Sequence, residues 1–503
     1  MTGLCSVSRH DCFNGEAMTI SSAGDLPFRV GSSPQIFAYV AISHDATTQH
    51  TMGLESPHEQ EDVMTTPLSH LSHRTDLDSI LGILRNRKTR RFGCGMEIPE
   101  GPLRFQSQLP PIPLSKEELQ YLLFAGVGQT GMHLGDMQYA PRLGGEDGQG
   151  MAIMSFQGRT VPSPCAAQAT RMFVTDDTGL YFVARVPDPD SMEMPLLVKL
   201  REGRLEIPRE MPYMLSFNQW YVNRPGTLYF IPVTDIASVY VNLLLALFSN
   251  ECGYFIVDSD NGHAACGLDG FRRSRGGHLY DDMAKRRTMT LRDIDAAIND
   301  TALQEQAVVC QNMFLMEQAL GLGGGIHSVG SGRHLLGWEP RIFEGLGFHF
   351  APSPVSGVRS NPVGVPNVWE GPCPPFLPSM KEAVLRMVTS KFGEMGTYSS
   401  TGARPWTDAR TSSSIGKHEE RAVEATIAFC AYVMRTYGRF PAHTDAFKTV
   451  VAFQAHHLDL DFYDTFYPNE SVPQAHRDHL MAWHQGKRAE EPGLSSLQEG
   501  VRP

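Results

Sequence analysis

The chain has 503 residues, and its 43 Lys and Arg against 55 Asp and Glu give a formal net charge of −12 at pH 7. This length allows roughly two to four domains. A content of 41% hydrophobic and 19% charged residues is typical of a globular protein and not of a disordered, collagen-like or coiled-coil chain. The acidic balance disfavours a nucleic-acid partner, because that affinity comes mainly from Lys and Arg that displace counterions.

No segment stays apolar over the ~20 residues that a membrane-spanning helix needs, since the longest apolar run, 237–248, is interrupted by Asn242. The N-terminus lacks the basic segment followed by an apolar one that marks a secretory signal. The nine cysteines are scattered without a Cys-x-x-Cys pair, so they predict neither a disulfide framework nor a cysteine zinc site. These features favour a cytoplasmic protein with no membrane partner.

The N-terminal part of the chain, residues 1–75, is rich in Ser, Thr, His, Asp and Glu. We expect a poorly ordered leader there, with one strand-like patch at 35–42. Met52 and Met64 lie just before the first expected helix, and we hypothesise that translation begins at one of them. Organised structure is expected from 76–84 onward, where an acidic turn precedes apolar residues at helical spacing.

Local signals predict several further elements. Ser115 and Glu118 form a capping-box pattern that predicts a second helix over 115–123. Residues 172–183 alternate around an Asp-Thr-Gly turn and predict a β-hairpin, and 228–232 predicts another strand. Helical periodicity continues in three segments: 235–248, 291–299 and 303–320. This mixture of helices with a few strands predicts an α+β domain.

A Pro- and Gly-rich stretch at 351–379 predicts a linker or wrapping arm. It is expected to join the α+β domain, residues 76–350, to a helical C-terminal extension, residues 380–503. The longest helix of that extension is expected over 418–437, and the chain has no internal repeat.

Three motifs have residues suited to ligand binding. Residues 86–92 place several cations at a helix end, where guanidinium groups bind phosphate; a solvated helix end is the alternative. Residues 159–168 offer Ser163 and Gln168 to a flat heteroaromatic ligand, or form an ordinary turn. Residues 311–327 contain three consecutive glycines at 323–325, which let backbone amides approach a ligand; a glycine helix cap followed by a loop is the alternative.

In this order the three motifs resemble the nitroreductase superfamily of flavin enzymes, over roughly residues 76–360. In that family the first helix ends in an Arg-rich, Phe-terminated motif, and a late helix ends in Leu-Gly-Leu with a glycine-containing loop. Arg159-Thr-Val-Pro-Ser163 and Gln311-Asn312 are similar to the azoline-dehydrogenase branch, which oxidises thiazolines or oxazolines in peptides. The resemblance implies a sandwich with a central, mostly antiparallel sheet flanked by helices, and a homodimer with FMN at its interface.

The resemblance also implies which residues contact the cofactor. Lys88 stands where the family often has Ser, Ala166 where classical nitroreductases usually carry Asn, and Ser328 replaces a common acidic residue. Residues 345–348 resemble the last core strand. The implied contacts with FMN are Arg87, Lys88, Arg90, Ser163, Gln168, Gly324, Gly325, His327, Ser328 and Arg359.

The implied chemistry is hydride transfer through flavin N5, to or from a small organic or peptide-derived substrate. The loop at 272–281 is expected on the substrate side, where His278 or Tyr280 would relay a proton; the alternative is a structural or solvent-facing role. On a helix, His457 and Asp461 would share one face, a spacing compatible with metal ligation. An interdomain polar network is the preferred alternative, so no metal site is assigned.

Three functions therefore remain open. The preferred one is an FMN-dependent oxidoreductase closer to the azoline-dehydrogenase branch than to the small nitroaromatic reductases. The second is a reductase of nitroaromatics or quinones that uses NAD(P)H as co-substrate. The third is a noncatalytic flavin-fold scaffold, which is motivated by Ala166, Ser328 and the long C-terminal extension.

Overall fold

The structure is a computed structural model that describes residues 75–136, 153–185, 196–282, 284, 286–399, 404–408, 410–411, 415–474 and 476–478. All of these belong to one compact unit, which begins at Asp62. The expected leader, with its strand-like patch and both alternative starts, lies outside the described residues. Every helix in the described part of the chain is too short or too polar to cross a membrane.

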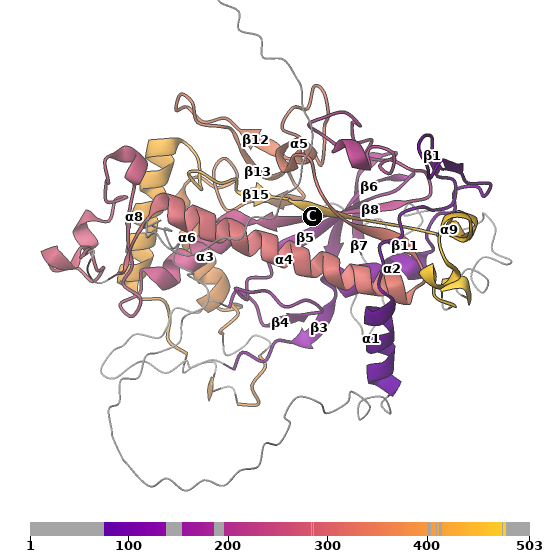
Figure 1. The fold of residues 1–503 in the computed structure, drawn as a ribbon. Coiled ribbons are helices and arrows are strands. Elements are labelled where there is room, and N and C mark those ends of the chain that lie inside the picture. The colour runs from indigo at the N-terminus through magenta and orange to yellow at the C-terminus, as the bar shows by residue number, and fades with distance from the viewer. Residues whose placement is uncertain are drawn as a thin grey trace, which may run out of the picture. The chain divides into compact units, whose positions relative to one another are not determined.

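A seven-stranded sheet forms the centre of this unit (Figure 1), and each of its strand pairings is antiparallel. The hairpin and the strand expected from the sequence are confirmed as β5, β6 and β8. The strand order is β11 (Gly323–Ser328), β16 (Val451–His456), β8 (Leu228–Asp235), β5 (Thr170–Thr175), β6 (Gly179–Arg185) and β7 (Leu196–Glu202), with β15 (Phe447–Lys448) also paired to β8.

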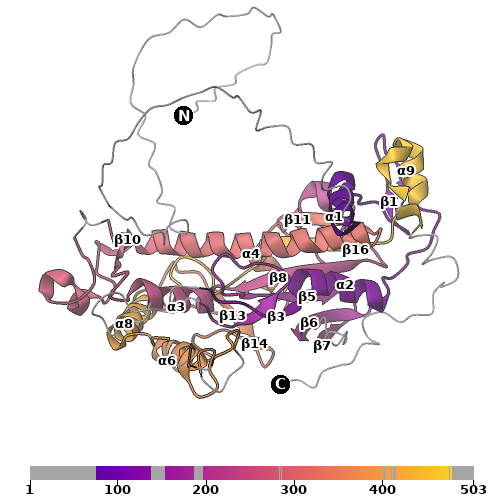
Figure 2. The ribbon, with the colours of Figure 1, turned by 90° about the horizontal axis from the view of Figure 1, so that it is seen from below.

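Two helices cover one face of this sheet: α2 (Lys116–Val127) and α4 (Leu291–Ala319). Figure 2 shows α4 running along the length of the sheet. The two helices expected at 291–299 and 303–320 are one helix of 29 residues. The segment between them contains no Gly or Pro, and Ala302 is buried, so the helix continues through it.

The start of α2 has the capping box that its sequence predicts. The Glu118 N–H donates to Ser115 Oγ at 3.2 Å, and the Ser115 N–H donates to Glu118 Oε2 at 2.7 Å. We expect Ser115→Ala to lower the free energy of unfolding by about 1 kcal/mol, because it leaves a helix N–H without its acceptor. Denaturant unfolding measures this, and Ser115→Thr, which keeps the hydroxyl, should cost less.

The opposite face of the sheet packs against a small antiparallel sheet and its flanking loops. Trp369 lies 5.7 Å from Phe182, and Phe348 lies 5.8 Å from Phe173, between ring centroids. The small sheet consists of β12 (His349–Ala351), β13 (Asn361–Val365) and β14 (Trp369–Glu370), so the stretch expected as a linker contains ordered strands.

The strand expected at 345–348 is a turn instead. Gly345 and Gly347 have φ of 57° and 80°, which an extended strand cannot contain. The chain therefore reverses before β12 begins.

The segment expected as a helical extension contributes β15 and β16 to the central sheet, as well as helices. Side chains along β16 alternate between the two faces of the sheet, so Phe453 and Ala455 both point toward the core formed with α2 and α4. Together α6 (Met380–Phe392) and α8 (Glu420–Tyr437) pack against α3 (Ile236–Leu247) at the N-terminal end of α4, whereas α9 (Leu460–Phe466) lies near its C-terminal end (Figures 1 and 2).

The first helix expected from the sequence is confirmed as α1 (Thr75–Asn86). The remaining α-helix and strands of the described residues are short: α5 (Gly332–Leu336), β1 (Glu97–Ile98), β2 (Phe105–Gln106), β3 (Gln129–Met132), β4 (Gln157–Arg159), β9 (Phe255–Val257) and β10 (Thr288–Thr290).

Candidate functional site

A pocket of about 830 Å³ lies beside α9, and we call it the large pocket. This volume is within the ~300–1,000 Å³ that small-molecule and cofactor sites occupy. Its wall is formed by residues 88–92 after α1 and the nearby residues 98–103, together with Trp220 and the distant residues 462–471.

Aromatic rings and cations share this wall. Phe92 and Phe462 stack with centroids 4.2 Å apart, and Tyr463 and Tyr467 lie 5.9 Å apart. Trp220 completes the aromatic side of the pocket. Planar rings of this kind bind flat ligands, and adjacent cations bind anions. The wall also contains one carboxylate, Glu100. The aromatic rings and cations of the large pocket together suit a ligand with both a flat ring system and a negative charge.

Arg90 is a structural residue of this wall. Its guanidinium is only 2% exposed. Its Nε donates to the Ser471 carbonyl at 2.9 Å, Nη1 donates to Gln318 Oε1 at 2.9 Å, and Nη2 donates to the Asn86 carbonyl at 3.3 Å. All three nitrogens are thus engaged within the protein, so the phosphate contact that the resemblance implied for Arg90 does not fit this structure.

Arg91 is the cation that lies between the aromatic rings. Its guanidinium is 5.3 Å from the Trp220 ring centroid and 5.0 Å from that of Tyr221, and Nη1 donates to Asn218 Oδ1 at 2.8 Å. The side chain is half-buried and lines the large pocket. Stacking on two rings holds the guanidinium plane in place.

The two preceding cations differ from each other. Lys88 is exposed and lines the large pocket, while its backbone N–H donates to Gln318 Oε1 at 3.2 Å. Arg87 is also exposed, but its guanidinium lies 5.4 Å over the Phe314 ring, and it does not line the pocket. Of the three predicted cations, the structure places Lys88 and Arg90 in the pocket wall.

The glycines of β11 contact protein backbone. The Gly324 N–H donates to the Arg90 carbonyl at 2.8 Å, so it is not available to a flavin as the resemblance implied. A Cβ on Gly325 would lie 2.9 Å from Thr89 Cγ2. The expected glycine-rich turn is therefore mostly a strand, and small residues are needed there because residues 89–90 pack against it.

Ser163 and Gln168 lie together at a separate place. Ser163 Oγ donates to Glu305 Oε2 at 2.7 Å and accepts from the Gln168 N–H at 3.2 Å. Both residues line a cavity of about 20 Å³, which has room for about one water molecule. Glu305 and Gln318 are 13 residues apart in α4, so these residues lie roughly 20 Å from Arg90 along that helix.

His278 and Tyr280, the predicted proton relay, lie near the N-terminal end of α4. His278 is buried, and its Nε2 is 2.8 Å from the Phe248 carbonyl. The Tyr280 ring lies between Arg273 and Arg287, each 4.5 Å from its centroid. Since α4 has 29 residues, roughly 40 Å of helix separates this loop from the large pocket. The structure does not bring these two residues to the pocket of the same subunit.

The remaining predicted contacts also lie outside the large pocket. Ser328 is exposed at the end of β11, opposite Val451. Arg359 is exposed between β12 and β13, where its carbonyl accepts from Arg439 Nη1 at 3.0 Å. His327 packs against the Tyr229 ring at 5.3 Å. None of the three lines the large pocket.

The suggested metal pair is separated by secondary structure. His457 follows β16 directly, and Asp461 lies in α9, so the helical spacing assumed for them does not occur. His457 Nε2 is instead 3.5 Å from Glu118 Oε2 and 3.3 Å from the Pro113 carbonyl. Across the described ranges, no three His, Cys, Asp or Glu side chains are grouped to hold a metal ion.

Two histidines near Arg91, the buried His456 and the half-buried His327, are expected to make the fold sensitive to acid. Burial, reinforced by Arg91, lowers the pKa of His456 to about 3; burial lowers that of His327 to about 4. In the unfolded chain both protonate near pH 6.5. Between that pH and the folded-state pKa the unfolded state binds more protons, so stability is highest above pH 6.5 and decreases as the pH falls.

We expect His456→Asn to reduce this acid sensitivity. Each such histidine changes the free energy of unfolding by at most about 1.4 kcal/mol per pH unit. Denaturant unfolding at a series of pH values from 7 to 4 measures the slope. An unchanged slope in His456→Asn would show that this imidazole is not the source.

Sequence reasoning missed the aromatic half of the pocket and one buried carboxyl. Phe462, Tyr463 and Tyr467 recur along a segment whose aromatic density is the signal that was available. Glu317 is fully buried, and burial raises its pKa well above the usual range, although the Arg90 charge opposes this. The sequence contains no local signal for Glu317, because its neighbours come from other parts of the chain.

Comparison with known proteins leaves the family open. No model of a protein family matches the chain, and no curated protein matches it. Among solved structures, the crystal structure of a candidate nitroreductase from Ralstonia eutropha JMP134 is similar with a TM-score of 0.22 and 16% identity, over 55% of this chain and 74% of that one. A TM-score and a sequence identity this low carry no argument about the fold or the function of this chain.

Proposed function

We propose that the protein is an FMN-dependent oxidoreductase that binds its flavin in the large pocket. The observation that supports this is the combination of cations and aromatic rings around about 830 Å³. Bound FMN would supply hydride transfer through its N5. A soluble cytoplasmic enzyme with a small organic or peptide-derived substrate remains the proposal from the sequence.

The residues present suit the parts of FMN. Lys88 and Arg91 would hold the phosphate through charge-assisted hydrogen bonds. Trp220, Tyr463 and Tyr467 would contact the flat ring system. Arg90 would act indirectly, because it ties the residues after α1 to Gln318 and Ser471 and so positions its two cationic neighbours.

A homodimer is part of this proposal, as the resemblance to the nitroreductase superfamily implies. Ser163 and Gln168 lie roughly 20 Å from Arg90 within one subunit. A flavin that contacts both groups would therefore take them from two subunits. Light scattering on the purified protein tests this, and a monomer that binds FMN would remove Ser163 and Gln168 from the site.

The first experiment is the absorption spectrum of the purified protein from 300 to 600 nm, with the released chromophore identified by mass. We expect oxidised flavin, and Lys88→Ala or Arg91→Ala should weaken FMN binding about 10- to 100-fold, since each loses interactions of about 1.5–3 kcal/mol. Fluorescence quenching of added FMN measures the affinity.

Arg87→Ala is the matched control, because Arg87 is an exposed cation of the same motif that does not line the large pocket. We expect its FMN affinity to stay unchanged. If Arg87→Ala weakens binding while Arg91→Ala does not, the flavin is bound elsewhere.

One observation favours the noncatalytic alternative. The Ser163 hydroxyl is engaged by Glu305 and faces a cavity of only about 20 Å³, so this motif has no ligand-sized space in one subunit. A colourless protein that does not bind added FMN would support a scaffold role. Oxidation of NAD(P)H by quinones would instead favour the reductase alternative over a dehydrogenase.

A further inference from the structure

Five side chains on or against one face of the central sheet, four of them buried and His327 half-buried, contain buried polar atoms without hydrogen-bond partners among the described residues. We call them the polar row. The atoms are Tyr221 Oη, Tyr229 Oη, His327 Nε2, Gln454 Oε1, and both ring nitrogens of His456.

Strand register explains why these side chains share a face. Tyr229, Gln454 and Gly325 lie opposite one another on β8, β16 and β11. His456 and His327 are each two residues further along their strands, so they point to the same side.

Tyr221 connects the two histidines of the polar row. Its ring centroid is 5.7 Å from His456 and 6.4 Å from His327, and His327 is 5.3 Å from Tyr229. The row is therefore continuous from His456 to Tyr229. The Tyr221 ring meets both imidazoles edge-on.

Apart from Gln454 Oε1, which only accepts, the polar row consists of neutral groups that both donate and accept. Burial lowers the pKa of the two histidines to about 3 and about 4, and it raises the pKa of both tyrosines. A neutral imidazole has one donor and one acceptor nitrogen, and a tyrosine hydroxyl does both. Burying several such atoms without partners is costly, and water molecules bound between them would remove that cost.

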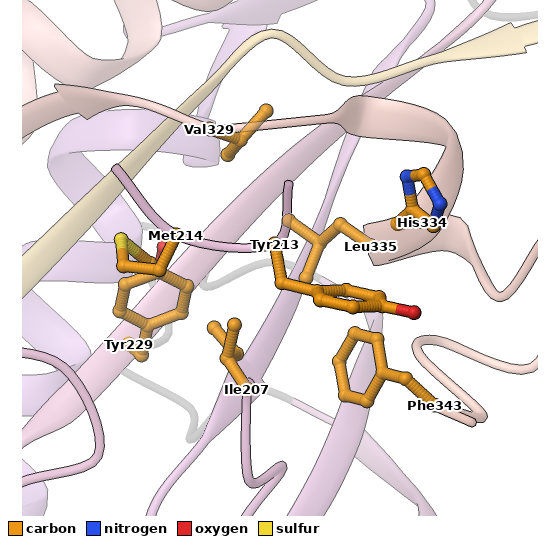
Figure 3. Close-up of a pocket in the computed structure, with 8 residues that line it drawn as sticks. All are labelled: Ile207, Tyr213, Met214, Tyr229, Val329, His334, Leu335 and Phe343. Carbon is orange, nitrogen blue, oxygen red and sulfur yellow. The ribbon is translucent and has the colours of Figure 1, made fainter. Parts of the chain in front are cut away.

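The polar row lies next to two cavities. In the middle of the row, Tyr221 is stacked by Arg91, which lines the large pocket. At the Tyr229 end, Tyr229 itself lines a cavity of about 10 Å³, which is about the size of one water molecule. Figure 3 shows Tyr229 on one side of this cavity and Tyr213 and His334 on the other.

This small cavity leads toward solvent. His334 Nε2 is 2.9 Å from Glu339 Oε2, and the Glu339 side chain is 43% exposed. His334 Nδ1 is also 2.7 Å from Ser331 Oγ. Groups that exchange protons thus extend from the wall of the large pocket to an exposed carboxylate.

We propose that the polar row holds a chain of water molecules that carries protons between Glu339 and the large pocket. This inference rests on the proposed function, because the flavin reaction in the large pocket would consume the protons. When a reduced flavin transfers a hydride to a quinone, two electrons and one hydrogen move together, and the second hydrogen of the hydroquinone arrives as a proton. A proton that leaves the row at the pocket is replaced from solvent at Glu339, so no charge accumulates.

The water chain is tested first, without any flavin, through Tyr221→Phe and Tyr229→Phe. Each variant removes one hydroxyl and keeps the ring. If water binds these hydroxyls, both variants should melt at the wild-type temperature or below it, like the control Tyr181→Phe, whose hydroxyl lies 2.9 Å from Thr178 Oγ1. If the hydroxyls are dry, both variants should melt above the wild type, and this result would overturn the proposal.

The proton path is tested by single-turnover oxidation of the reduced, FMN-loaded full-length protein by 1,4-benzoquinone, in H₂O and in D₂O. We expect Tyr229→Phe to slow oxidation on the order of 10²-fold, the low end of what positioned proton transfer contributes, with flavin content unchanged. Tyr181→Phe should match the wild type. Equal rates and equal isotope effects in Tyr229→Phe and the wild type would overturn the path.

The two tests separate this inference from the proposed function. If the protein binds no flavin, the proton path is withdrawn together with the proposed function, while the melting temperatures still decide whether the row contains water. If flavin binds but Tyr229→Phe leaves the oxidation rate unchanged, the proposed function stands and the proton path is wrong.

Discussion

Arg90→Ala is expected to destabilise the protein by about 3–5 kcal/mol, because it removes a buried cation together with its bonds to three parts of the chain. Those bonds join the end of α1 to Gln318 on α4 and to Ser471. Their loss leaves the Ser471 carbonyl without the Arg90 donor, and Gln318 Oε1 keeps only the Lys88 N–H. Denaturant unfolding measures the change.

Arg87→Ala is the control for this prediction. It removes the same side chain three residues earlier, from an exposed position over the Phe314 ring. We expect a change within about 0.5 kcal/mol, as for most surface substitutions. If Arg90→Ala is as stable as Arg87→Ala and loses only flavin, Arg90 is a ligand contact and the structural role assigned to it is wrong.

Gly323→Ala and Gly93→Ala are each expected to cost about 1–3 kcal/mol through overpacking. The two glycines lie on either side of the His456 ring. A Cβ on Gly323 would lie 3.0 Å from His456 Nε2 and 2.8 Å from the Arg90 carbonyl. A Cβ on Gly93 would overlap His456 Cδ2 and lie 2.6 Å from the His457 carbonyl. Neither backbone oxygen can move easily.

Gly82→Ala, in α1, serves as the control, because its Cβ would meet no atom within 4 Å. It should stabilise the protein slightly, since alanine favours a helix over glycine. We also expect Gly93→Ala and His456→Ala to be non-additive, because removing the ring relieves part of the overlap. Strict additivity in chemical denaturation would place His456 away from these glycines.

Elements that depend only on residues close together in the chain were predictable from the sequence. The capping box of α2 and the Asp-Thr-Gly hairpin are formed by residues close together in the chain, and both are present. The division of α4 into two helices was wrong, because a short run of polar residues, without Gly or Pro, does not end a helix that packs along a sheet.

The candidate site was only partly predictable. Residues 88–92 of the cationic motif line the large pocket, whereas Arg87 does not. Whether a cation in it faces ligand or protein depends on its partners, and those of Arg90 are 228 and 381 residues away in sequence. The same applies to Ser163, whose partner Glu305 is 142 residues away.

The sequence by itself therefore determined the globular α+β composition, the capped and amphipathic helices, the hairpin, and the existence of a cationic motif, because each depends on neighbouring residues. Only the tertiary structure decided that β16 completes the sheet, that Trp220 and α9 form the pocket with residues 88–92, and that His278 and Tyr280 lie at the far end of α4. These outcomes depend on contacts between segments far apart in the chain, which local periodicity and spacing do not specify.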